Sequence, residues 1–400
     1  MRLSIIIPTH NRAESLKRAM ESIVSLRDEV DFEIVIVDNN STDNTKKVTE
    51  NYSRIARYVF EGNTSFTKAR GTGAENAAGD IFLYLDDDVV VHPKSLISII
   101  ETFKNFPDCG IIASKILPYY ESEPPDWTLS CQQSFNGWSL YNPVIYPHLG
   151  IGFQEVTWSA GPMMAISRKA YMSVDGFPPD TVGVETDTQE STFRKLYVGP
   201  GDYGICDKIR KIGLKVYYVP NVSCFHVIPP ERFTVSFWRS RMIGEAHHKA
   251  ITNREFFNFS KRQLWLTRLK AKFKYKYWME RLYRQLKANE IYLSQTKFNG
   301  MLFEELRFLY YKSYIEIDTV LNKYSDLSEF LWRIGSNGIS SNEYKHIVSK
   351  LPIEFLRLID SEYMYSEKPI NSIDTFESFE FSMSIRVIQL AKRIIMKIRK

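Results

Sequence analysis

The sequence of 400 residues predicts an α/β domain followed by a helical C-terminal region. Short apolar runs that suit buried strands alternate over the first 120 residues with stretches that have helical apolar spacing. The charge is divided between the two parts. Residues 1–235 carry 23 Lys+Arg and 29 Asp+Glu, whereas residues 236–400 carry 29 and 18. Hydrophobic residues at 44% and charged residues at 25% exclude a disordered or low-complexity chain. We therefore expect two domains, 1–235 and 236–400.

The first part of the chain contains five runs that predict buried strands. They are Leu3–Pro8, Phe32–Asp38, Ala56–Phe60, Ile81–Leu85 and Gly110–Leu117. Helical spacing predicts helices over Asn11–Leu26 and Thr67–Ala78, and Pro93 begins another. Ser41 or Asp43 can cap the helix after the second strand. The alternation predicts a mostly parallel, Rossmann-like sheet with helices on both faces.

Polar residues follow three of these strands, at Pro8–Arg12, Asp38–Ser41 and Asp86–Asp88. Ligands of parallel α/β sheets bind beyond the carboxyl ends of the strands. The phosphate-binding patterns GxGxxG and GxxxxGK[ST] do not follow the first strand. A metal ion is therefore the expected means of holding phosphates.

Three consecutive aspartates, Asp86 to Asp88, are the strongest chemical signal. Carboxylates this close repel one another unless a cation or solvent compensates. If the strand continues, Asp86 and Asp88 point to one side and Asp87 to the other. The pair would suit Mg²⁺ or Mn²⁺, which favour oxygen ligands and leave positions for substrate phosphates. A solvated acidic turn is the alternative.

Several motifs in this order and spacing resemble family 2 glycosyltransferases of the GT-A fold. They extend over about the first 250 residues. They are Ser4–Thr9 with Asn11-Arg12, Val37–Asp43, Ala69-Arg70 through Asp80, Leu85–Asp88, Gly161–Arg168, Gly176-Phe177, Gly201-Asp202, and Arg210 through Tyr218–Pro220 to His226. The resemblance implies the GT-A nucleotide-diphospho-sugar transferase fold with a C-terminal helical extension.

The same resemblance implies a set of residues that bind the nucleotide and the donor sugar. Asp38 would accept a hydrogen bond from the base, and Arg70 would lie near the diphosphate. The other members are Pro8, Thr9, Asn11, Arg12, Asn40, Asp86, Asp87 and Trp158. Alternatives are a turn residue for Asp38, a surface ion pair for Arg70 and a core position for Trp158.

The metal ligands that the resemblance implies are Asp88, Asp86 and His226, with Mn²⁺ or Mg²⁺ as the cofactor. A lone histidine such as His226 is more often structural. The general base would be Asp202, in Pro200-Gly201-Asp202, where the family has Gly-Glu-Asp. Gly201 thus replaces a glutamate. The alternative for Asp202 is a helix N-cap, and Asp207 and Asp187 are weaker candidates for the base.

The C-terminal region is basic and aromatic. Lys261–Lys287 holds ten basic residues and one acidic residue, and Ile385–Lys400 repeats the pattern as an amphipathic helix. Such segments bind anionic membrane surfaces. The alternatives are packing on the catalytic domain and a homo-oligomer contact. Nucleic acid is not an expected partner, because no known motif is present. Met301–Ile359 has helical spacing and no assigned role.

We therefore expect an inverting glycosyltransferase that moves a sugar from a nucleotide-diphosphate sugar, with UDP favoured, to an acceptor hydroxyl. The acceptor would be a glycan or a lipid-linked acceptor in surface polysaccharide synthesis. A catalytically idle binding protein and a nucleotidyltransferase are the alternatives. The first residues do not predict a signal peptide, and no apolar run predicts a membrane span. Widely spaced cysteines fit a reducing compartment, so we expect a cytoplasmic protein peripheral on the inner face of the membrane.

Overall fold

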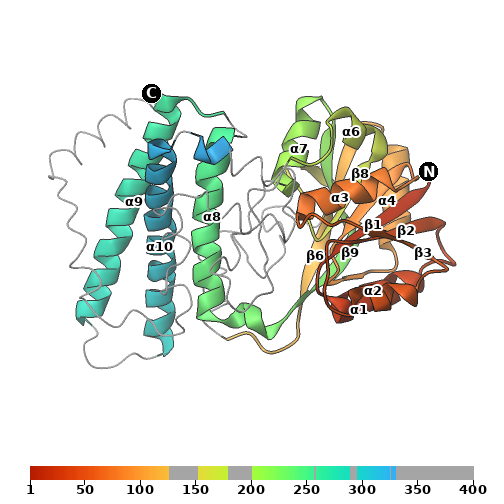
Figure 1. Cartoon of the computed structure of the whole chain (residues 1–400), viewed down its shortest axis with the longest axis horizontal. Coiled ribbons are helices and arrows are strands. Elements are labelled where there is room, and N and C mark those ends of the chain that lie inside the picture. Colours follow the sequence, from red (N-terminus) through yellow and green to blue (C-terminus); the bar gives the residue numbers. More distant parts are fainter. Residues whose placement is uncertain (126–151, 179–200, 256–257, 289–294, 325, 330–400) are drawn as a thin grey trace.

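A computed structural model describes residues 1–125, 152–178, 201–255, 258–288, 295–324 and 326–329. It consists of an α/β part and a group of three long helices beside it (Figure 1). Residues 330–400 of the expected second domain, which include Ile385–Lys400, lie outside the described residues, as does the segment 179–200 before Gly201.

The α/β part is built on one sheet of nine strands in the order β3-β2-β1-β4-β8-β6-β9-β5, with β7 paired to β9. The strands are β1 (Leu3–Thr9), β2 (Phe32–Asp38), β3 (Ala56–Phe60), β4 (Ile81–Leu85), β5 (Val89–Val91), β6 (Cys109–Tyr120), β7 (Gln154–Val156), β8 (Met163–Ser167) and β9 (Lys215–Ile228). All five predicted strands are present, and three of them have the predicted bounds. Continuous apolar runs identify these strands because both faces of the sheet are covered.

The sheet is mixed, and the expectation of a mostly parallel sheet is wrong in its second half. Strands β3, β2, β1 and β4 are parallel neighbours, and β6 is parallel to β9. Strand β8 runs antiparallel to both β4 and β6, and β5 and β7 run antiparallel to β9. The βαβ alternation from which parallel pairing was predicted ends before β8, so the rule for crossover helices does not apply there.

Helices cover both faces of the sheet, as the alternation predicted. They are α1 (Ala13–Val24), α2 (Thr45–Glu50), α3 (Phe66–Glu75), α4 (Ser95–Asn105), α6 (Arg168–Ser173) and α7 (Gly201–Lys211). Helices α1 and α4 bury Leu16, Met20 and Ile99 in one core cluster. Helices α3 and α7 bury Ala69 and Ile205 in a second cluster. Each fully buried aliphatic side chain contributes roughly 1.5–3 kcal/mol.

The Asp43 carboxylate accepts hydrogen bonds from backbone N–H groups in the first turns of two helices. Its Oδ1 accepts a hydrogen bond from the Thr45 N–H at the start of α2, and its Oδ2 accepts one from the Ala13 N–H of α1. The two predicted helix starts at these sequence positions are therefore tied together. Ser41 does not cap α2, because its Oγ accepts from the Asn11 N–H instead.

Three long helices follow the sheet. A 3₁₀ turn, η1 (Pro230–Phe233), leads into α8 (Val235–Glu255), which is followed by α9 (Lys261–Ala288) and α10 (Gln295–Lys323). Helix α10 packs against both α8 and α9 (Figure 1). The change from sheet to helices falls at Val235, and the division of the chain into two domains stays a prediction. None of the described helices combines the length and the apolarity that crossing a membrane requires.

Candidate active site

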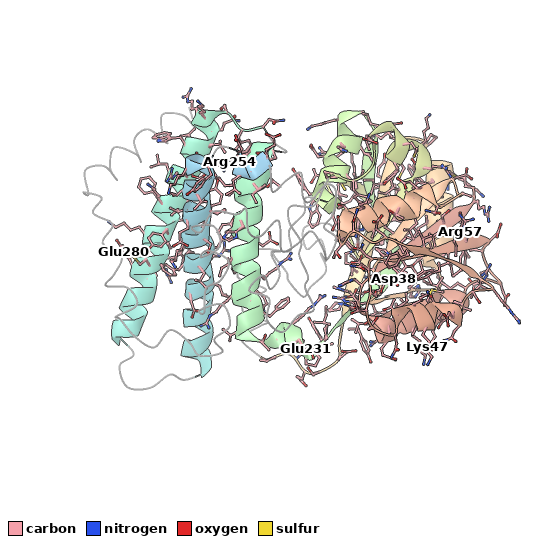
Figure 2. The ribbon with its side chains drawn as sticks, viewed as in Figure 1. Asp38, Lys47, Arg57, Glu231, Arg254 and Glu280 are labelled. Atoms are coloured by element: carbon pink, nitrogen blue, oxygen red, sulfur yellow. The ribbon has the colours of Figure 1, made fainter. Side chains whose placement is uncertain are left out.

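The carboxyl ends of β1, β2 and β4 lie next to one another, because these strands are parallel neighbours. Polar side chains gather at this edge. Thr9 ends β1 and its hydroxyl donates to Asp87 Oδ2 at 2.7 Å. Asp38 ends β2 and accepts hydrogen bonds from the Ser41 N–H at 2.9 Å and the Tyr58 hydroxyl at 2.8 Å (Asp38 is labelled in Figure 2). The sequence motifs at three strand ends therefore form one site.

The three aspartates do not alternate as expected. Strand β4 ends at Leu85, and Asp87 and Asp88 lie in a turn before β5. Because the backbone turns there, Asp87 and Asp88 share a partner: Arg12 Nη1 lies 3.2 Å from Asp87 Oδ1 and 2.9 Å from Asp88 Oδ2. Asp86 Oδ1 instead lies 3.3 Å from Arg70 Nη2. The expected alternation required the strand to continue through the aspartates, and this condition is not met because β4 ends at Leu85.

Asp88 is the buried aspartate that most cations surround. Its Oδ1 lies 3.3 Å from His226 Nε2, and its Oδ2 lies 3.4 Å from Arg232 Nη2. Burial alone would raise the pKa of Asp88, but His226, Arg12 and Arg232 outweigh burial and hold that pKa well below its ordinary value. Asp88 is therefore ionised, and Arg12 and Arg232 are its counter-charges.

Asp87 behaves in the opposite way. Burial and the neighbouring carboxylates of Asp88 and Asp86 raise the pKa of Asp87 to about 7, against the opposing effects of Arg12 and Thr9. Burial also raises the pKa of Asp86, to which Asp88 and Asp202 add and which Arg70 opposes. The cluster thus holds more carboxylates than its cations compensate, and a further cation would stabilise it.

Asp88 and His226 fit a divalent metal ion as a pair of ligands. Strand β5 pairs antiparallel with β9 and places Val89 opposite His226, which brings the imidazole to Asp88. Asp88 Oδ1 is buried and meets no hydrogen-bond criterion with the described residues, although His226 Nε2 lies 3.3 Å away. Within the described part of the chain, no three His, Cys, Asp or Glu residues are arranged to hold a metal. Asp86 does not join the pair in this arrangement, so its predicted metal role remains untested.

Arg70 joins two acidic groups from different parts of the chain. It lies in α3 and is 1% exposed. Its Nη1 lies 2.7 Å from Asp202 Oδ1, and its Nη2 donates to the Gly161 carbonyl at 3.2 Å and contacts Asp86. Arg70 also stacks over Phe66, with its guanidinium carbon 4.0 Å from the ring centroid. Arg70 is therefore a buried connector, and the alternative of a surface ion pair is wrong.

Asp202 lies in the first turn of α7, where a carboxylate is favoured by the helix dipole. Its side chain is 36% exposed, so one face is open to solvent while Arg70 holds the other. Gly161 allows this approach, because a Cβ on residue 161 would lie 2.3 Å from Asp202 Oδ2. Gly201, where the family has a glutamate, packs on α3: a Cβ there would meet Thr67 Cγ2 at 3.2 Å.

The loop after β1 and the loop after β2 bind each other. Asn11 and Asn40 both have left-handed backbone conformations, with φ of 52° and 66°. Asn11 Oδ1 accepts from the Thr42 N–H at 2.7 Å, and His10 Nδ1 lies 2.7 Å from the Asn39 carbonyl oxygen. The predicted nucleotide residues Asn11, Arg12, Asp38 and Asn40 thus lie on one connected pair of loops. Pro8 is buried within β1.

Trp158 is partly buried and packs against the core cluster that contains α3 and α7. A role in stacking on the donor sugar stays a prediction.

Two residues at the site were assigned no role from the sequence. Arg232 belongs to η1, and the run Pro229-Pro230-Glu231 before it gave no sign that its side chain reaches Asp88. Tyr58 lies in β3, and only the parallel pairing of β2 with β3 brings it to Asp38.

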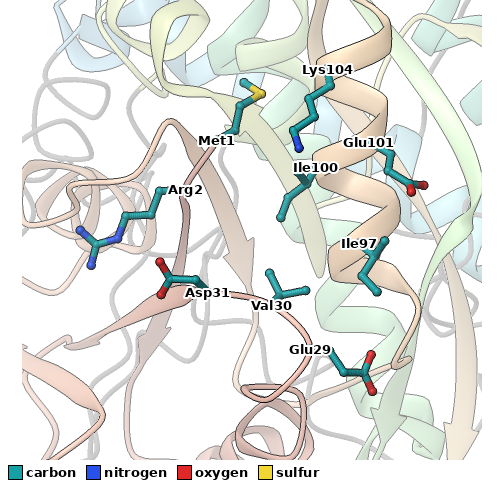
Figure 3. Close-up of a pocket in the computed structure, with 9 residues that line it drawn as sticks. All are labelled: Met1, Arg2, Glu29, Val30, Asp31, Ile97, Ile100, Glu101 and Lys104. Atoms are coloured by element: carbon teal, nitrogen blue, oxygen red, sulfur yellow. The ribbon is translucent and has the colours of Figure 1, made fainter.

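A hollow of about 560 Å³ lies elsewhere, at the amino ends of β1 and β2 (Figure 3). Acidic and basic side chains border it together with apolar ones, and none of the predicted site residues takes part. It is lined by Met1, Arg2, Glu29, Val30, Asp31, Ile97, Ile100, Glu101 and Lys104. It is open to solvent and is distinct from the candidate active site.

Part of the chain is similar in sequence to known glycosyltransferases. Residues 4–172 match the model of the family described as Glycosyl transferase family 2. Glucosyl-dolichyl phosphate glucuronosyltransferase of Haloferax volcanii is 22% identical over 54% of this chain and 70% of its own length. Dolichol-phosphate mannosyltransferase of Pyrococcus furiosus is 32% identical over 28% of this chain and 32% of its own length.

Among solved structures, a mannosyltransferase from Pyrobaculum calidifontis in complex with GDP-Man and Mn²⁺ is 17% identical, with a TM-score of 0.43 over 91% of this chain and 85% of that chain. The sequence matches, rather than the fold, indicate a glycosyltransferase. Through residues 4–172, the chain is similar to glycosyl transferase family 2.

Proposed function

We propose that the protein transfers a sugar from a nucleotide-diphosphate sugar to an acceptor hydroxyl with inversion, with Asp202 as the general base. The contact that carries this proposal is the one between Arg70 and two carboxylates. Arg70 contacts Asp202 at 2.7 Å and Asp86 at 3.3 Å, so one guanidinium brings the proposed base close to the aspartates that follow β4. A displacement reaction needs this arrangement, with a base on one side of the sugar and the leaving diphosphate on the other.

Each residue of the site has a physical role in this proposal. Asp202 takes the proton of the attacking hydroxyl through the oxygen that Arg70 leaves open. Arg70 fixes the orientation of that carboxylate, because a planar guanidinium holds two acceptors in set directions. Asp38 and Tyr58 border the base of the nucleotide. Arg12 and Arg232 contact Asp88 and are close enough to the aspartate turn to contact the diphosphate.

Asp88 and His226 would hold a divalent metal ion, with Mn²⁺ favoured over Mg²⁺ because an imidazole is among the ligands. The metal would supply positive charge against the departing diphosphate. Two protein ligands are sufficient, because phosphate oxygens and water complete the shell of such ions at nucleotide sites.

The names of two relatives support a proposal for the acceptor class. Two of them are named for dolichyl phosphate or dolichol phosphate substrates. We propose a lipid-linked acceptor, with UDP-sugar as the donor, and a location on the inner face of the membrane. The chain spans about a third of the length of the mannosyltransferase relative, so the activity of the whole chain is part of this proposal.

The replacement of the family glutamate by Gly201 does not favour an idle site. Packing accounts for Gly201, because a Cβ at this position would lie only 3.2 Å from Thr67 Cγ2. An idle site would also have no reason to keep Asp202 paired with a buried arginine, which costs desolvation free energy.

The test is release of nucleoside diphosphate from a panel of sugar nucleotides with Mn²⁺, with Mg²⁺ and with chelator. Metal-dependent release from one donor is the expected result. Asp202→Asn should lower transfer by about 10²–10⁴-fold and leave nucleotide affinity unchanged. Asp207→Asn, on the same helix but paired with Lys211, is the matched control. Full transfer by Asp202→Asn would exclude Asp202 as the base.

A further inference from the structure

We propose that the exposed side of α9 binds the surface of an anionic lipid bilayer. We call this side the α9 outer face and define it by its exposed residues that carry the argument: Lys261, Arg262, Trp265, Lys270, Lys274, Tyr277 and Arg281. The proposal deepens the membrane location proposed above, and its test is independent of catalysis.

The opposite side of α9 is already used for packing. Ala271 and Tyr275 are buried, and the Tyr275 ring stacks on Phe308 of α10 at a centroid distance of 5.2 Å. Arg268 donates to the Thr319 hydroxyl of α10 at 2.7 Å. These contacts fix the rotation of α9 about its axis. The outer face is therefore turned away from α10, and α9 is the outermost of the three helices from the sheet (Figure 1).

An apolar stripe runs along the outer face. Trp265, Leu269, Phe273 and Tyr277 follow one another at four-residue spacing and so lie on one side of the helix. Trp265 is 54% exposed and Tyr277 is 48% exposed, whereas Leu269 and Phe273 are half-buried. Large exposed aromatics on a soluble helix have a hydration cost, and Trp and Tyr are the residues that favour the membrane–water interface.

Cations border this stripe. Five exposed basic residues lie between positions 261 and 281, against Glu280 as the one exposed acid of that segment. Lys270 and Lys274 follow the stripe on one side, and Lys272 and Lys276 lie on the other side in half-buried positions. An apolar stripe between two rows of cations places rings in the headgroup region and ammonium groups at lipid phosphates.

The same side chains suit nucleic acid less well. Proteins that bind single strands by stacking place aromatic rings in a positively charged groove, and the α9 outer face is a convex helix surface. The half-buried Leu269 and Phe273 at its centre gain from contact with acyl chains and gain nothing from phosphates. An anionic bilayer is therefore the occupant that uses both the apolar stripe and the cations.

The test is flotation of the full chain with vesicles of phosphatidylcholine alone and of phosphatidylcholine with phosphatidylglycerol. We expect binding to the anionic vesicles only, weakened by added salt. The triple variant Lys270→Gln, Lys274→Gln, Arg281→Gln should bind about a hundredfold more weakly, at about 1 kcal/mol, or fivefold, for each cation near an anionic leaflet. Trp265→Ser with Tyr277→Ser should also lower binding at least tenfold.

The matched control removes three exposed lysines from the α/β part, with Lys17→Gln, Lys46→Gln and Lys47→Gln. It should bind anionic vesicles as the wild type does. An equal loss in this control, or no loss in either α9 variant, would overturn the proposal. Competition by single-stranded RNA that displaces the protein from vesicles would assign the face to nucleic acid, and a change of mass with the aromatic variant would assign it to self-association. Donor hydrolysis by the α9 variants in solution should equal that of the wild type, so failure here leaves the transferase proposal intact.

Discussion

A single residue without a side chain sets the geometry of the proposed base. The carboxylate of Asp202 lies against the backbone of Gly161, and Arg70 donates to the carbonyl of that same glycine. Any Cβ at position 161 would overlap both oxygens of Asp202, at 2.3 Å and 2.6 Å. The Asp202 carboxylate can therefore occupy this position only because residue 161 has no Cβ, and Arg70 holds it there.

Gly161→Ala should lower the rate of sugar transfer by about 100-fold, because a displacement of about 1 Å in a reacting group has an effect of that size. The melting temperature should change little, since Asp202 can rotate toward solvent. Gly62→Ala is the matched control, because its Cβ would lie at an ordinary 3.5 Å from Phe60. Steady-state kinetics and thermal unfolding of both variants provide the measurement. A wild-type rate for Gly161→Ala would show that the position of this carboxylate is not critical.

At the scale of elements, buried ion pairs join the long helices. Arg239 of α8 is fully buried, and its Nε lies 2.6 Å from Oε1 of Glu305 in α10, which is 3% exposed. Asp318 of α10, 1% exposed, pairs with Arg254 of α8 and with Arg268 of α9. Because an unpaired buried charge is costly, such pairs fix the rotation and the axial register of the three helices relative to one another.

Glu305→Leu alone should lower the free energy of unfolding by about 3–5 kcal/mol, because it leaves the Arg239 guanidinium buried without its carboxylate. The double variant Arg239→Met with Glu305→Leu should recover most of that loss, because both charges are then absent. Urea unfolding of the two single variants and the double variant forms a complete cycle. A double variant as unstable as the single ones would mean that the pair is not the cause.

His247 makes α8 sensitive to pH. It is 2% exposed, and neither ring nitrogen has a hydrogen-bond partner among the described residues. Burial lowers the pKa of His247 from 6.5 to about 4. As the pH is lowered below 6.5, the imidazole takes up a proton in the unfolded chain but not in the folded chain. The free energy of unfolding therefore falls as the pH is lowered from 6.5 to 4.

Protonation linked to His247 lowers the free energy of unfolding by about 3 kcal/mol in total, and about 2 kcal/mol of this decrease has occurred by pH 5. His247→Leu should reduce the loss of stability between pH 7.5 and pH 5 by about that amount. His92→Gln, at an exposed histidine, should leave the pH dependence as it is. Urea unfolding at the two pH values measures both. An unchanged pH profile in His247→Leu would show that this histidine is not buried as a neutral group.

At the scale of the whole molecule, a separate apolar cluster connects the sheet to the helices. Ile228 ends β9, Phe233 belongs to η1, Trp238 and Met242 lie in α8, and Leu306 lies in α10. Figure 2 shows Glu231 of η1 at the link between the two parts. Because Arg232 lies in the same turn and contacts Asp88, this junction also positions a residue of the active site.

Trp238 is fully buried in this junction, and Trp238→Ala should lower the free energy of unfolding by about 3–5 kcal/mol. We expect calorimetry to show one transition for the wild type and two for the variant, as the helices lose their coupling to the sheet. Trp265→Ala, at an exposed position of α9, is the matched control and should keep the single transition. A single transition in Trp238→Ala would mean that other contacts couple the two parts.

Local sequence patterns predicted strands β1 to β4 and β6, several helices of the α/β part and the polar residues that follow three strand ends. The apolar runs of β2, β3 and β4 predicted their bounds because burial on both faces requires continuous apolar residues. The motifs around Arg12, Asp38 and Asp88 predicted which strand ends would carry the site, because parallel neighbours bring their ends to one edge.

Tertiary structure alone decided how the side chains pair. The turn at Asp87 and Asp88 overrides the alternation of a strand, so Arg12 binds both while Asp86 faces Arg70. Arg70 and Asp202 are 132 residues apart and meet only because α3 and α7 cover the same face of the sheet. The antiparallel strand β8 likewise had no local signal. Periodicity reports which face of an element is buried, whereas the partner across that face depends on the path of the whole chain.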